Sequence, residues 1–244
     1  MLFRSGIDWL AIPTTLAGMV DASVGGKTGI NSEHGKNLVG SFHSPVAVLI
    51  DISFTHSLSE RDFAAGMAEV VKCGFIADTQ ILTLLKGKNI AEASGDQDLL
   101  LELIHRSVSV KAKVVSEDFK ESFLREILNY GHTLGHAIEK HSNYSLRHGE
   151  AVAIGMCFVA ELAKEKSSLS ENVVALHYEI LKSLNLPTNY KLAAWPELQE
   201  LMLQDKKNRG GALRFVALED LGKCVRIEAP KSEELESAYA RIAQ

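Results

Sequence analysis

Residues 59–72 read Ser-Glu-Arg-Asp-Phe-Ala-Ala-Gly-Met-Ala-Glu-Val-Val-Lys, and at this stretch the pattern of the chain changes from strand-like to helical. Ser59, with Asp62 three residues later, resembles the capping box that opens a helix. The apolar residues that follow are spaced as on one side of a helix: Phe63, Met67, Val70 and Val71. The sequence therefore predicts that a helix begins here.

Glu69 interrupts the apolar part of this predicted helix. A carboxylate among small and apolar residues needs a metal ion, an arginine or a lysine beside it. Lys72 follows three residues later, which places it on the same side of a helix. Two interpretations are open: Glu69 is a metal ligand, or it forms a structural ion pair with Lys72.

The rest of the chain is also mainly helical in pattern. The predicted helices cover residues 98–117, 121–141, 149–166 and 171–184, with Asn, Gly or Ser in most of the gaps. Two apolar runs, 213–218 and 224–227, flank the turn sequence Asp220-Leu221-Gly222 and predict a small β-hairpin.

The segment before residue 58 has a strand-like rather than a helical residue pattern. Short strand-like runs at 9–12 and 46–51 are separated by a glycine- and lysine-rich stretch, 25–40. The second run ends in Asp51 before a loop, which suggests a buried parallel strand whose carboxyl end faces a site. So few short strands cannot form a stable covered sheet. We therefore expect an α/β plus all-α chain, with residues 1–57 as the second half of an α/β domain and residues 58–244 as a mainly helical domain.

Composition and charge limit the class of protein. The 244 residues suffice for one large domain or two unequal ones, and 46% apolar with 23% charged residues is ordinary for a globular chain. A net charge of −5 gives no electrostatic reason to bind nucleic acid or an anionic membrane. The three cysteines are too scattered for a disulfide framework, and the sequence has neither an apolar run long enough to cross a bilayer nor a signal-peptide pattern. We therefore expect a cytoplasmic protein, and we expect it to be an enzyme.

Histidine gives the strongest chemical signal, because four of the nine histidines lie between residues 132 and 148. On a continuous helix over 121–141, one arc of ~60° beside the apolar stripe carries a cation, an amide and two imidazoles. These residues are Arg125, Asn129, His132 and His136. Such a set is more typical of a cleft wall than of a solvated face, although a polar face with incidental histidines is the simpler alternative.

His148 begins the next predicted helix and can face back toward the preceding one. Two imidazoles from adjacent helices plus a carboxylate, for which Glu69 is the candidate, make a three-ligand site with an open position, as in catalytic zinc centres. The segment 132–136 is not the metalloprotease motif H-E-x-x-H, because Thr133 occupies the glutamate position.

The sequence Val-Gly-Gly-Lys-Thr-Gly at 24–29 is similar to a phosphate-binding P-loop, but Asp21 stands where that motif needs its first glycine. A glycine-rich loop remains that presents Lys27 and then Lys36 and Asn37, suited to phosphate or a polyol. A basic surface turn is the alternative. The basic stretch 205–211, taken alone, is typical of a solvated turn.

Several long motifs, in order along the chain, resemble the 3-dehydroquinate synthase family. They include Val-Asp-Ala-Ser-Val-Gly-Gly-Lys-Thr-Gly-Ile-Asn at 20–31, Ala-Glu-Val-Val-Lys at 68–72, Asn-Tyr-Gly-His-Thr-Leu-Gly-His at 129–136 and His-Gly-Glu-Ala-Val at 148–152. Shorter matches occur at 12–16 and 35–40, so the resemblance extends over essentially the whole chain.

The resemblance implies a two-domain enzyme with a Rossmann-like NAD-binding domain and a helical metal- and substrate-binding domain. It implies conversion of 3-deoxy-D-arabino-heptulosonate 7-phosphate to 3-dehydroquinate and phosphate in the shikimate pathway, with NAD and one divalent metal, zinc or cobalt. In the family, NAD oxidises the substrate transiently, phosphate is eliminated, the ketone is reduced again and the ring closes by an aldol step. A homodimer is also implied.

The resemblance also assigns roles by motif. The metal ligands are Glu69, His132 and His148. The NAD-contacting residues are Thr14, Thr15, Lys27, Lys36, Phe54, Thr55, His56 and Ser57. The residues lining the substrate pocket are Asp21, Lys27, Asn37, Lys72, Lys111, Arg125, Asn129, His136 and one lysine of the pair Lys206 and Lys207, of which we favour Lys206.

The sequence departs from the family pattern in two places. Family members carry a further segment before this point, including the glycine-rich turn that holds the NAD pyrophosphate, so we expect this chain alone to bind NAD weakly. They also place an arginine directly before the glycine matching Gly6, where this chain has Ser5 and places Arg4 one residue earlier. Competing interpretations are another sugar-phosphate cyclase, an iron-dependent alcohol dehydrogenase, which the Gly25-Gly26-Lys27 loop disfavours, and an inactive metal-binding remnant.

Overall fold

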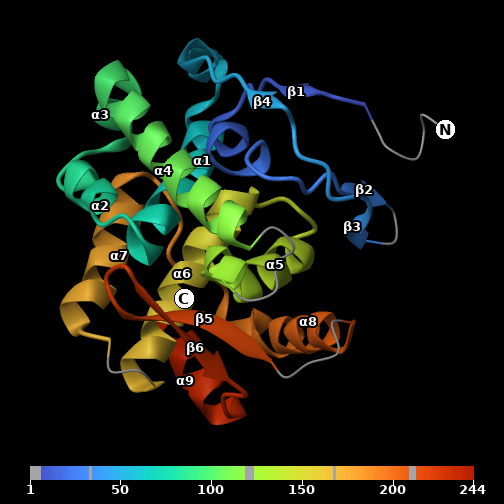
Figure 1. Cartoon of the computed structure of the whole chain (residues 1–244). Coiled ribbons are helices and arrows are strands. Elements are labelled where there is room, and N and C mark those ends of the chain that lie inside the picture. Colours follow the sequence, from blue (N-terminus) through green and yellow to red (C-terminus); the bar gives the residue numbers. More distant parts are fainter. Residues whose placement is uncertain (1–6, 33–34, 119–123, 167–168, 209–212) are drawn as a thin grey trace.

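The structure is a computed structural model that describes residues 7–32, 35–118, 124–166, 169–208 and 213–244 (Figure 1). Its longer helices are α1 (Glu60–Ile76), α4 (Gln97–Glu117), α5 (His132–His141), α6 (His148–Lys166), α7 (Glu171–Ser183), α8 (Trp195–Asn208) and α9 (Ser232–Ile242). Two short helices, α2 (Gln80–Leu85) and α3 (Ile90–Gly95), lie between α1 and α4. The remaining turns of helix are η2 (Gly18–Ala22), η3 (Ile52–Ser57), η4 (Leu124–Asn129) and η5 (Leu192–Ala194).

The strands form three two-stranded sheets in the described part of the chain. β1 (Leu10–Ala11) pairs in parallel with β4 (Ala47–Val48), and β2 (Ile30–Ser32) pairs antiparallel with β3 (Gly35–Val39). β5 (Arg214–Asp220) and β6 (Lys223–Glu228) form an antiparallel hairpin. The chain is therefore mainly helical, with few strands.

Helix α6 is the centre of the molecule. Every residue from Gly149 to Ala163 is buried, as expected for a helix that is apolar on all sides. It packs against α1, α5, α7, α9 and β5, which surround it in Figure 1. The position of each surrounding element is therefore set relative to this one helix.

Glycines allow the backbones of neighbouring elements to touch α6. A Cβ atom on Gly149 would lie 1.8 Å from the carbonyl oxygen of Ala65 in α1, and one on Gly155 would lie 1.9 Å from the carbonyl oxygen of Gly131. Such distances are far below van der Waals contact, so only glycine fits at these crossings. The two contacts bring α1 and the start of α5 against α6.

The expected helices and hairpin are confirmed, with one exception. α4, α6 and α7 agree with the predicted ranges to within one residue at either end, and β5 and β6 form the predicted hairpin. At the start of α1, the Ser59 hydroxyl accepts a hydrogen bond from the Asp62 backbone N–H at 3.1 Å, as the capping pattern indicates.

The prediction of one continuous helix over 121–141 is wrong. The described part is a 3₁₀ helix, η4, followed by a break and then by α5. Gly131 has φ +77°, a left-handed conformation that ends η4 and allows the chain to approach α6 closely. Arg125 and Asn129 therefore do not share a helix face with His132 and His136. Residues 119–123 lie outside the described chain.

The front segment also differs from the expectation. The two strand-like runs pair in parallel, but each contributes only two residues, and the strand at 46–51 is not buried. Asp51 instead caps η3 by accepting a hydrogen bond from the Ser53 N–H at 2.9 Å. The stretch 25–40, expected as a loop, contains the β2–β3 hairpin.

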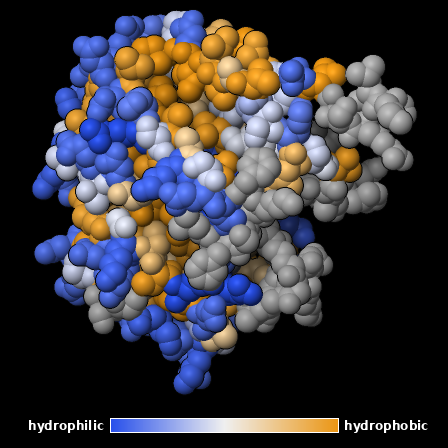
Figure 2. All heavy atoms as spheres, viewed as in Figure 1, coloured by the Kyte–Doolittle hydropathy of each residue, from blue (hydrophilic) through white to orange (hydrophobic). Residues whose placement is uncertain are grey.

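Apolar side chains are exposed on this front segment. Figure 2 shows hydrophobic residues gathered where Figure 1 places β1 and β4. Those on or beside β1 and β4 that are more than half exposed are Ile7, Leu10, Ile12, Val46 and Leu49, and Val39 of β3 is exposed to a similar degree. Two strands of two residues bury too little apolar surface to form a core of their own.

Among the described helices, none combines the length and hydropathy needed to cross a bilayer.

A fully buried histidine joins α7 to the core. His177 stacks on Phe75 of α1, with ring centroids 3.6 Å apart and planes 6° from parallel. Its Nδ1 lies 2.7 Å from the Val173 carbonyl oxygen, and its Nε2 lies 2.8 Å from the Tyr130 hydroxyl. Because a carbonyl only accepts, Nδ1 carries the proton and the hydroxyl donates to Nε2. Burial lowers the pKa of His177 to about 4.

We expect Gly149→Ala to destabilise the fold by about 1–3 kcal/mol or more, because its methyl group would overlap the Ala65 carbonyl. Urea unfolding measures this loss. Gly95→Ala is the matched control, because nothing lies within 4 Å of a Cβ atom at Gly95, and its free energy of unfolding should change by less than about 0.5 kcal/mol. Equal stabilities of the two variants would contradict the close helix crossing.

We expect His177→Phe to make the fold less sensitive to acid. The pKa of His177 is about 4 in the folded chain and 6.5 in its ordinary state, so the unfolded chain binds this proton more tightly. Stability is therefore lost as the pH falls from about 6.5 to about 4, by roughly 3 kcal/mol. The variant should lose about 1–3 kcal/mol at neutral pH, because the Tyr130 hydroxyl stays unpaired. Identical pH slopes of unfolding free energy for variant and wild type would contradict a neutral buried ring.

Candidate metal centre and anion-binding cluster

The two carboxylate oxygens of Glu69 face different partners. Glu69 is only 1% exposed, and its Oε2 pairs with the ammonium group of Lys72, which is also buried. Its Oε1 faces Nε2 of His148 at 3.5 Å and Nε2 of His132 at 3.7 Å. The sequence left open whether Glu69 pairs with Lys72 or belongs to a metal site. The structure shows both contacts on the same carboxylate: one oxygen pairs with Lys72, and the other joins His132 and His148 in what we call the histidine cluster.

His132 and His148 are the first residues of α5 and α6, and both rings are oriented by a second contact. Nδ1 of His132 lies 3.0 Å from the carbonyl oxygen of Tyr130, and Nδ1 of His148 lies 3.2 Å from Oε2 of Glu139. Both partners accept hydrogen bonds, so each Nδ1 carries a proton. Both Nε2 atoms are thereby directed to the same carboxylate oxygen, Glu69 Oε1.

These three side chains fit a divalent metal ion. Their ligand atoms lie within 4.8 Å of one another. Glu69 Oε1 is buried without a hydrogen-bond partner in the described chain, which is costly for an anion unless a cation lies beside it. One carboxylate and two imidazoles suit zinc or cobalt, and three protein ligands leave a coordination position for substrate or water.

The electrostatics of the cluster follow from burial and close charges. Burial alone would raise the pKa of Glu69, but Lys72, His148 and His132 outweigh it and hold that pKa well below its usual range. Burial and the nearby Lys72 lower the pKa of His132 to about 3. Burial would also lower the pKa of His148, but its contacts with Glu139 and Glu69 raise it to about 9. Glu69 is therefore anionic and His132 neutral at pH 7.

A second charged pair lies beside the first. Lys111 of α4 donates to Asp21 Oδ1 at 2.6 Å and to the carbonyl oxygen of Asp21 in η2. Burial and Glu69 act to raise the pKa of Asp21, but Lys111 and Lys72 overcome both and lower it. The pKa of Lys72 is in turn raised by Glu69 and Asp21, against the effect of burial. Two carboxylates and two ammonium groups thus form one cluster of close opposite charges.

Arg125 adds a third buried cation near the glycine-rich loop. Its backbone N–H donates to Asp118 Oδ2 at 3.0 Å. Gly25, with φ +111°, lies so close to Arg125 that a Cβ atom there would be 3.1 Å from Nη2. The glycine-rich loop, η2, η4 and α4 are therefore brought together, and buried lysine and arginine side chains are what phosphate and carboxylate groups require.

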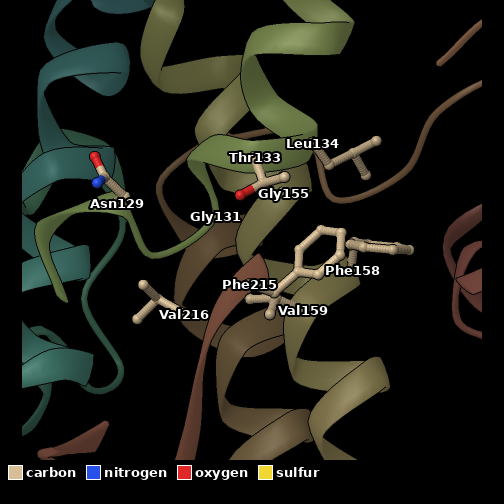
Figure 3. Close-up of a pocket in the computed structure, with 9 residues that line it drawn as sticks. All are labelled: Asn129, Gly131, Thr133, Leu134, Gly155, Phe158, Val159, Phe215 and Val216. Carbon is tan, nitrogen blue, oxygen red and sulfur yellow. The ribbon is translucent and has the colours of Figure 1, made fainter. Parts of the chain in front are cut away.

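His136 and Asn129 lie in different surroundings. His136 is exposed, with its ring centroid 5.3 Å from that of His132 and 5.9 Å from that of His148. Asn129 borders a recess between α5, α6 and β5 that is otherwise mostly apolar (Figure 3). The recess is too narrow to hold a substrate and is lined by Gly131, Thr133, Leu134, Gly155, Phe158, Val159, Phe215 and Val216.

The residues predicted to contact NAD lie on the front segment and on η3. Thr14 and Thr15 are exposed, and the Thr15 hydroxyl accepts a hydrogen bond from the Gly18 N–H at 3.1 Å. In η3, the buried Thr55 hydroxyl donates to the Ile52 carbonyl at 2.6 Å. Phe54, His56 and Ser57 are exposed. In the described chain, no hydrogen bond or ion pair links these residues to the histidine cluster.

Several predicted residues are described only in part. Lys27 is exposed and its backbone bridges to Phe42. The side chains of Lys36, Asn37, Lys206 and Lys207 lie outside the described structure, as do residues Arg4 and Ser5. Their predicted roles therefore stay predictions.

Sequence reasoning missed the groups that hold the histidines. Glu139 follows His132 by seven residues and His136 by three, so its place on the same side of α5 could have been found from spacing. The Tyr130 carbonyl could not have been found, because its direction depends on the turn at Gly131, where a helix was expected. His177, behind the Tyr130 hydroxyl, could not have been found either, because it is far along the chain and carries no local signal.

Comparison with known proteins adds to this geometry. Residues 1–65 match the family model for the 3-dehydroquinate synthase N-terminal region, and residues 66–208 match that for the C-terminal region. The chain is 55% identical over 238 residues to 3-dehydroquinate synthase of Corynebacterium diphtheriae, covering 98% of this chain and 66% of that protein. It is 53% identical to 3-dehydroquinate synthase of Mycolicibacterium vanbaalenii, covering 98% of this chain and 67% of that protein. The chain thus spans about two thirds of the length of these relatives.

Solved structures of sugar-phosphate cyclases are also similar. One is 2-epi-5-epi-valiolone synthase from Streptomyces hygroscopicus with NAD⁺ and Zn²⁺ bound, with a TM-score of 0.90 and 27% identity over 99% of this chain and 68% of that one. Another is 2-deoxy-scyllo-inosose synthase complexed with carbaglucose-6-phosphate, NAD⁺ and Co²⁺. Its TM-score is 0.85 and its identity 28%, over 98% of this chain and 68% of that one. On the matches of both family models and the identity to these relatives, the chain belongs to the 3-dehydroquinate synthase family.

Proposed function

We propose that this chain carries the metal- and substrate-binding part of a 3-dehydroquinate synthase, an NAD- and metal-dependent carbon–oxygen lyase. The reaction converts 3-deoxy-D-arabino-heptulosonate 7-phosphate to 3-dehydroquinate and phosphate. The observation that carries the proposal is the convergence of Glu69, His132 and His148 beside buried lysine and arginine side chains. A carboxylate- and phosphate-bearing polyol needs a Lewis acid and cations of this kind.

The metal ligands in this proposal are Glu69, His132 and His148. The bound metal supplies Lewis-acid chemistry toward substrate hydroxyl groups, and NAD supplies reversible oxidation of one of them. Solved structures similar to this chain hold NAD⁺ with Zn²⁺ or Co²⁺, which supports both cofactors.

The charged residues beside the histidines bind and orient the substrate in this proposal. Lys72, Lys111 and Arg125 supply positive charge for its carboxylate and phosphate, and Asp21 holds Lys111 in place. His136, exposed next to His132, holds or transfers a proton at the open side of the centre. Asn37, Asn129 and Lys206 are the further substrate contacts that the family motifs imply.

The division of the chain follows the same reasoning. We assign residues 58–244 to metal and substrate, and residues 1–57, the remnant of a Rossmann-like domain, to NAD through Thr14, Thr15, Lys27, Lys36 and the segment 54–57. The exposed apolar residues on β1 and β4 support a front segment that belongs to a larger domain, because large exposed apolar patches mark interaction surfaces. We also assign the protein to the cytoplasm, as a homodimer.

A different sugar-phosphate cyclase activity is the main alternative. The identities favour the dehydroquinate type, since they are 53–55% for the two relatives above and 27–28% for the two cyclases of known structure. The deciding experiment measures phosphate release from the heptulosonate 7-phosphate, with and without NAD, in a full-length protein that contains this sequence. No release with NAD and zinc present would reject the proposed activity.

We expect His132→Ala to abolish stoichiometric zinc binding, because it removes one of three ligands. Elemental analysis of the purified protein measures the zinc content. His141→Ala is the matched control on the same helix, because His141 contacts the Tyr190 hydroxyl at 2.8 Å and lies outside the cluster. Full zinc content in His132→Ala would show that the ligand assignment is wrong.

We expect His136→Ala to lower turnover by about 10²–10⁴-fold while zinc content stays near normal, since it removes a proton-transfer group and no ligand. Phosphate release in the full-length protein and elemental analysis measure the two quantities. His136 is exposed, so the folded core should be unaffected. Loss of zinc in parallel with activity would place His136 among the ligands instead.

A further inference from the structure

Glu139 of α5 is a buried carboxylate that the proposed function does not use. The residue is only 3% exposed, although the next residue on the helix, Lys140, is exposed. A buried carboxylate is costly unless a donor or cation lies beside it. Glu139 meets His148 of the next helix, with 3.2 Å between Oε2 and Nδ1.

This contact determines which nitrogen of His148 is available to a metal. Because an ionised carboxylate only accepts hydrogen bonds, Nδ1 of His148 donates its proton to Glu139. Nε2, on the opposite side of the ring, is then directed to Glu69 Oε1 at 3.5 Å. Rotation of the ring about its χ2 bond would break the Glu139 contact, so the same hydrogen bond sets both the tautomer and the orientation.

The two histidine ligands are held by different kinds of partner. His132 is oriented by a backbone carbonyl, that of Tyr130, whose position follows from the turn at Gly131. His148 is oriented by a side chain, that of Glu139. A side-chain partner also adds negative charge, which makes the imidazole a better electron donor to a metal.

A second arrangement of the same residues needs to be distinguished. Donor atoms of His136, Glu139 and His148 also lie within 4.8 Å of one another and could enclose a cation. The observed hydrogen bond argues against that use, because Nδ1 of His148 cannot donate to Glu139 and ligate a second ion at once. His136 is also exposed, whereas Glu69 and His132 are buried.

We propose that Glu139 is a positioning residue for the metal centre: its carboxylate accepts the Nδ1 proton of His148 and so presents Nε2 to the ion held with Glu69 and His132. The inference rests on the proposed function, because it assumes that these three residues bind a divalent metal. It extends that function by naming the group on which the third ligand depends.

The test compares Glu139→Gln with the wild-type chain. Gln keeps the shape of the side chain but removes its charge, so zinc affinity, measured by chelator competition at one fixed pH, should fall about 10–100-fold. The absorption spectrum of the Co²⁺-loaded protein should also change, because a neutral amide oxygen holds the Nδ1 proton of His148 more weakly than a carboxylate does. A purely structural role for Glu139 would alter unfolding without altering this spectrum.

Glu161→Gln is the matched control. Glu161 is likewise a buried carboxylate, lies on α6 and accepts a hydrogen bond from the Tyr178 hydroxyl at 3.0 Å, away from the histidines. Its replacement should leave zinc affinity and the Co²⁺ spectrum unchanged. In a His148→Ala background, Glu139→Gln should have no further effect on metal affinity, because the ring that it orients is gone.

The possible outcomes separate the two proposals. Unchanged affinity and spectrum in Glu139→Gln would overturn the positioning role and leave the metal centre intact. Two zinc ions per wild-type chain, reduced to one in Glu139→Gln, would also overturn it, since Glu139 would then be a ligand. No zinc binding by the wild-type chain would reject the metal centre itself, and the role of Glu139 with it.

Discussion

The burial of one negative charge, that of Glu69, is the constraint on which the site depends. A carboxylate in the buried part of a helix costs several kcal/mol unless cations or hydrogen-bond donors compensate it. Lys72 compensates one oxygen from within α1, and imidazoles from α5 and α6 face the other. The compensation requires that three helices be in place together, so the fold and the candidate metal centre are specified by the same contacts.

Close backbone approach is what brings those helices together. Gly149 lets α6 touch α1, and Gly155 lets it touch the turn before α5. As a result, the first residues of α5 and α6, both histidines, lie opposite Glu69. The second contacts of the rings, from the Tyr130 carbonyl and from Glu139, then select the same nitrogen on each. The precision of the centre therefore comes from helix packing rather than from a loop.

The front segment stands in contrast to this core. Its strands are two residues long where they pair in parallel, and apolar side chains such as Val46 remain exposed. η2 is attached to the helical body through the Asp21–Lys111 contact, and Leu16, just before η2, packs against Gly66 of α1. Ile50 and Ile52, around the start of η3, also pack against the core. The cluster of charged side chains beside the histidines is therefore shared between the two parts of the chain, with Asp21 from the front and Lys72, Lys111 and Arg125 from the helical body.

The sequence by itself determined the helical body, the capped start of α1, the β5–β6 hairpin and the histidine-rich segment, because apolar spacing and turn residues act locally. It also indicated that Glu69 needs a partner, since the cost of a buried charge depends on residue type alone. It could not determine that Gly131 breaks the helix expected over 121–141, because that conformation follows from packing against α6. Nor could it reveal that Glu139 and the Tyr130 carbonyl orient the two rings, or that His177 lies behind Tyr130. The Glu139–His148 and Tyr130–His177 contacts join residues that only the packing of α5, α6 and α7 brings within hydrogen-bond distance, and the Tyr130 carbonyl meets His132 through the turn at Gly131, which itself follows from packing on α6. The tertiary structure alone therefore decided them.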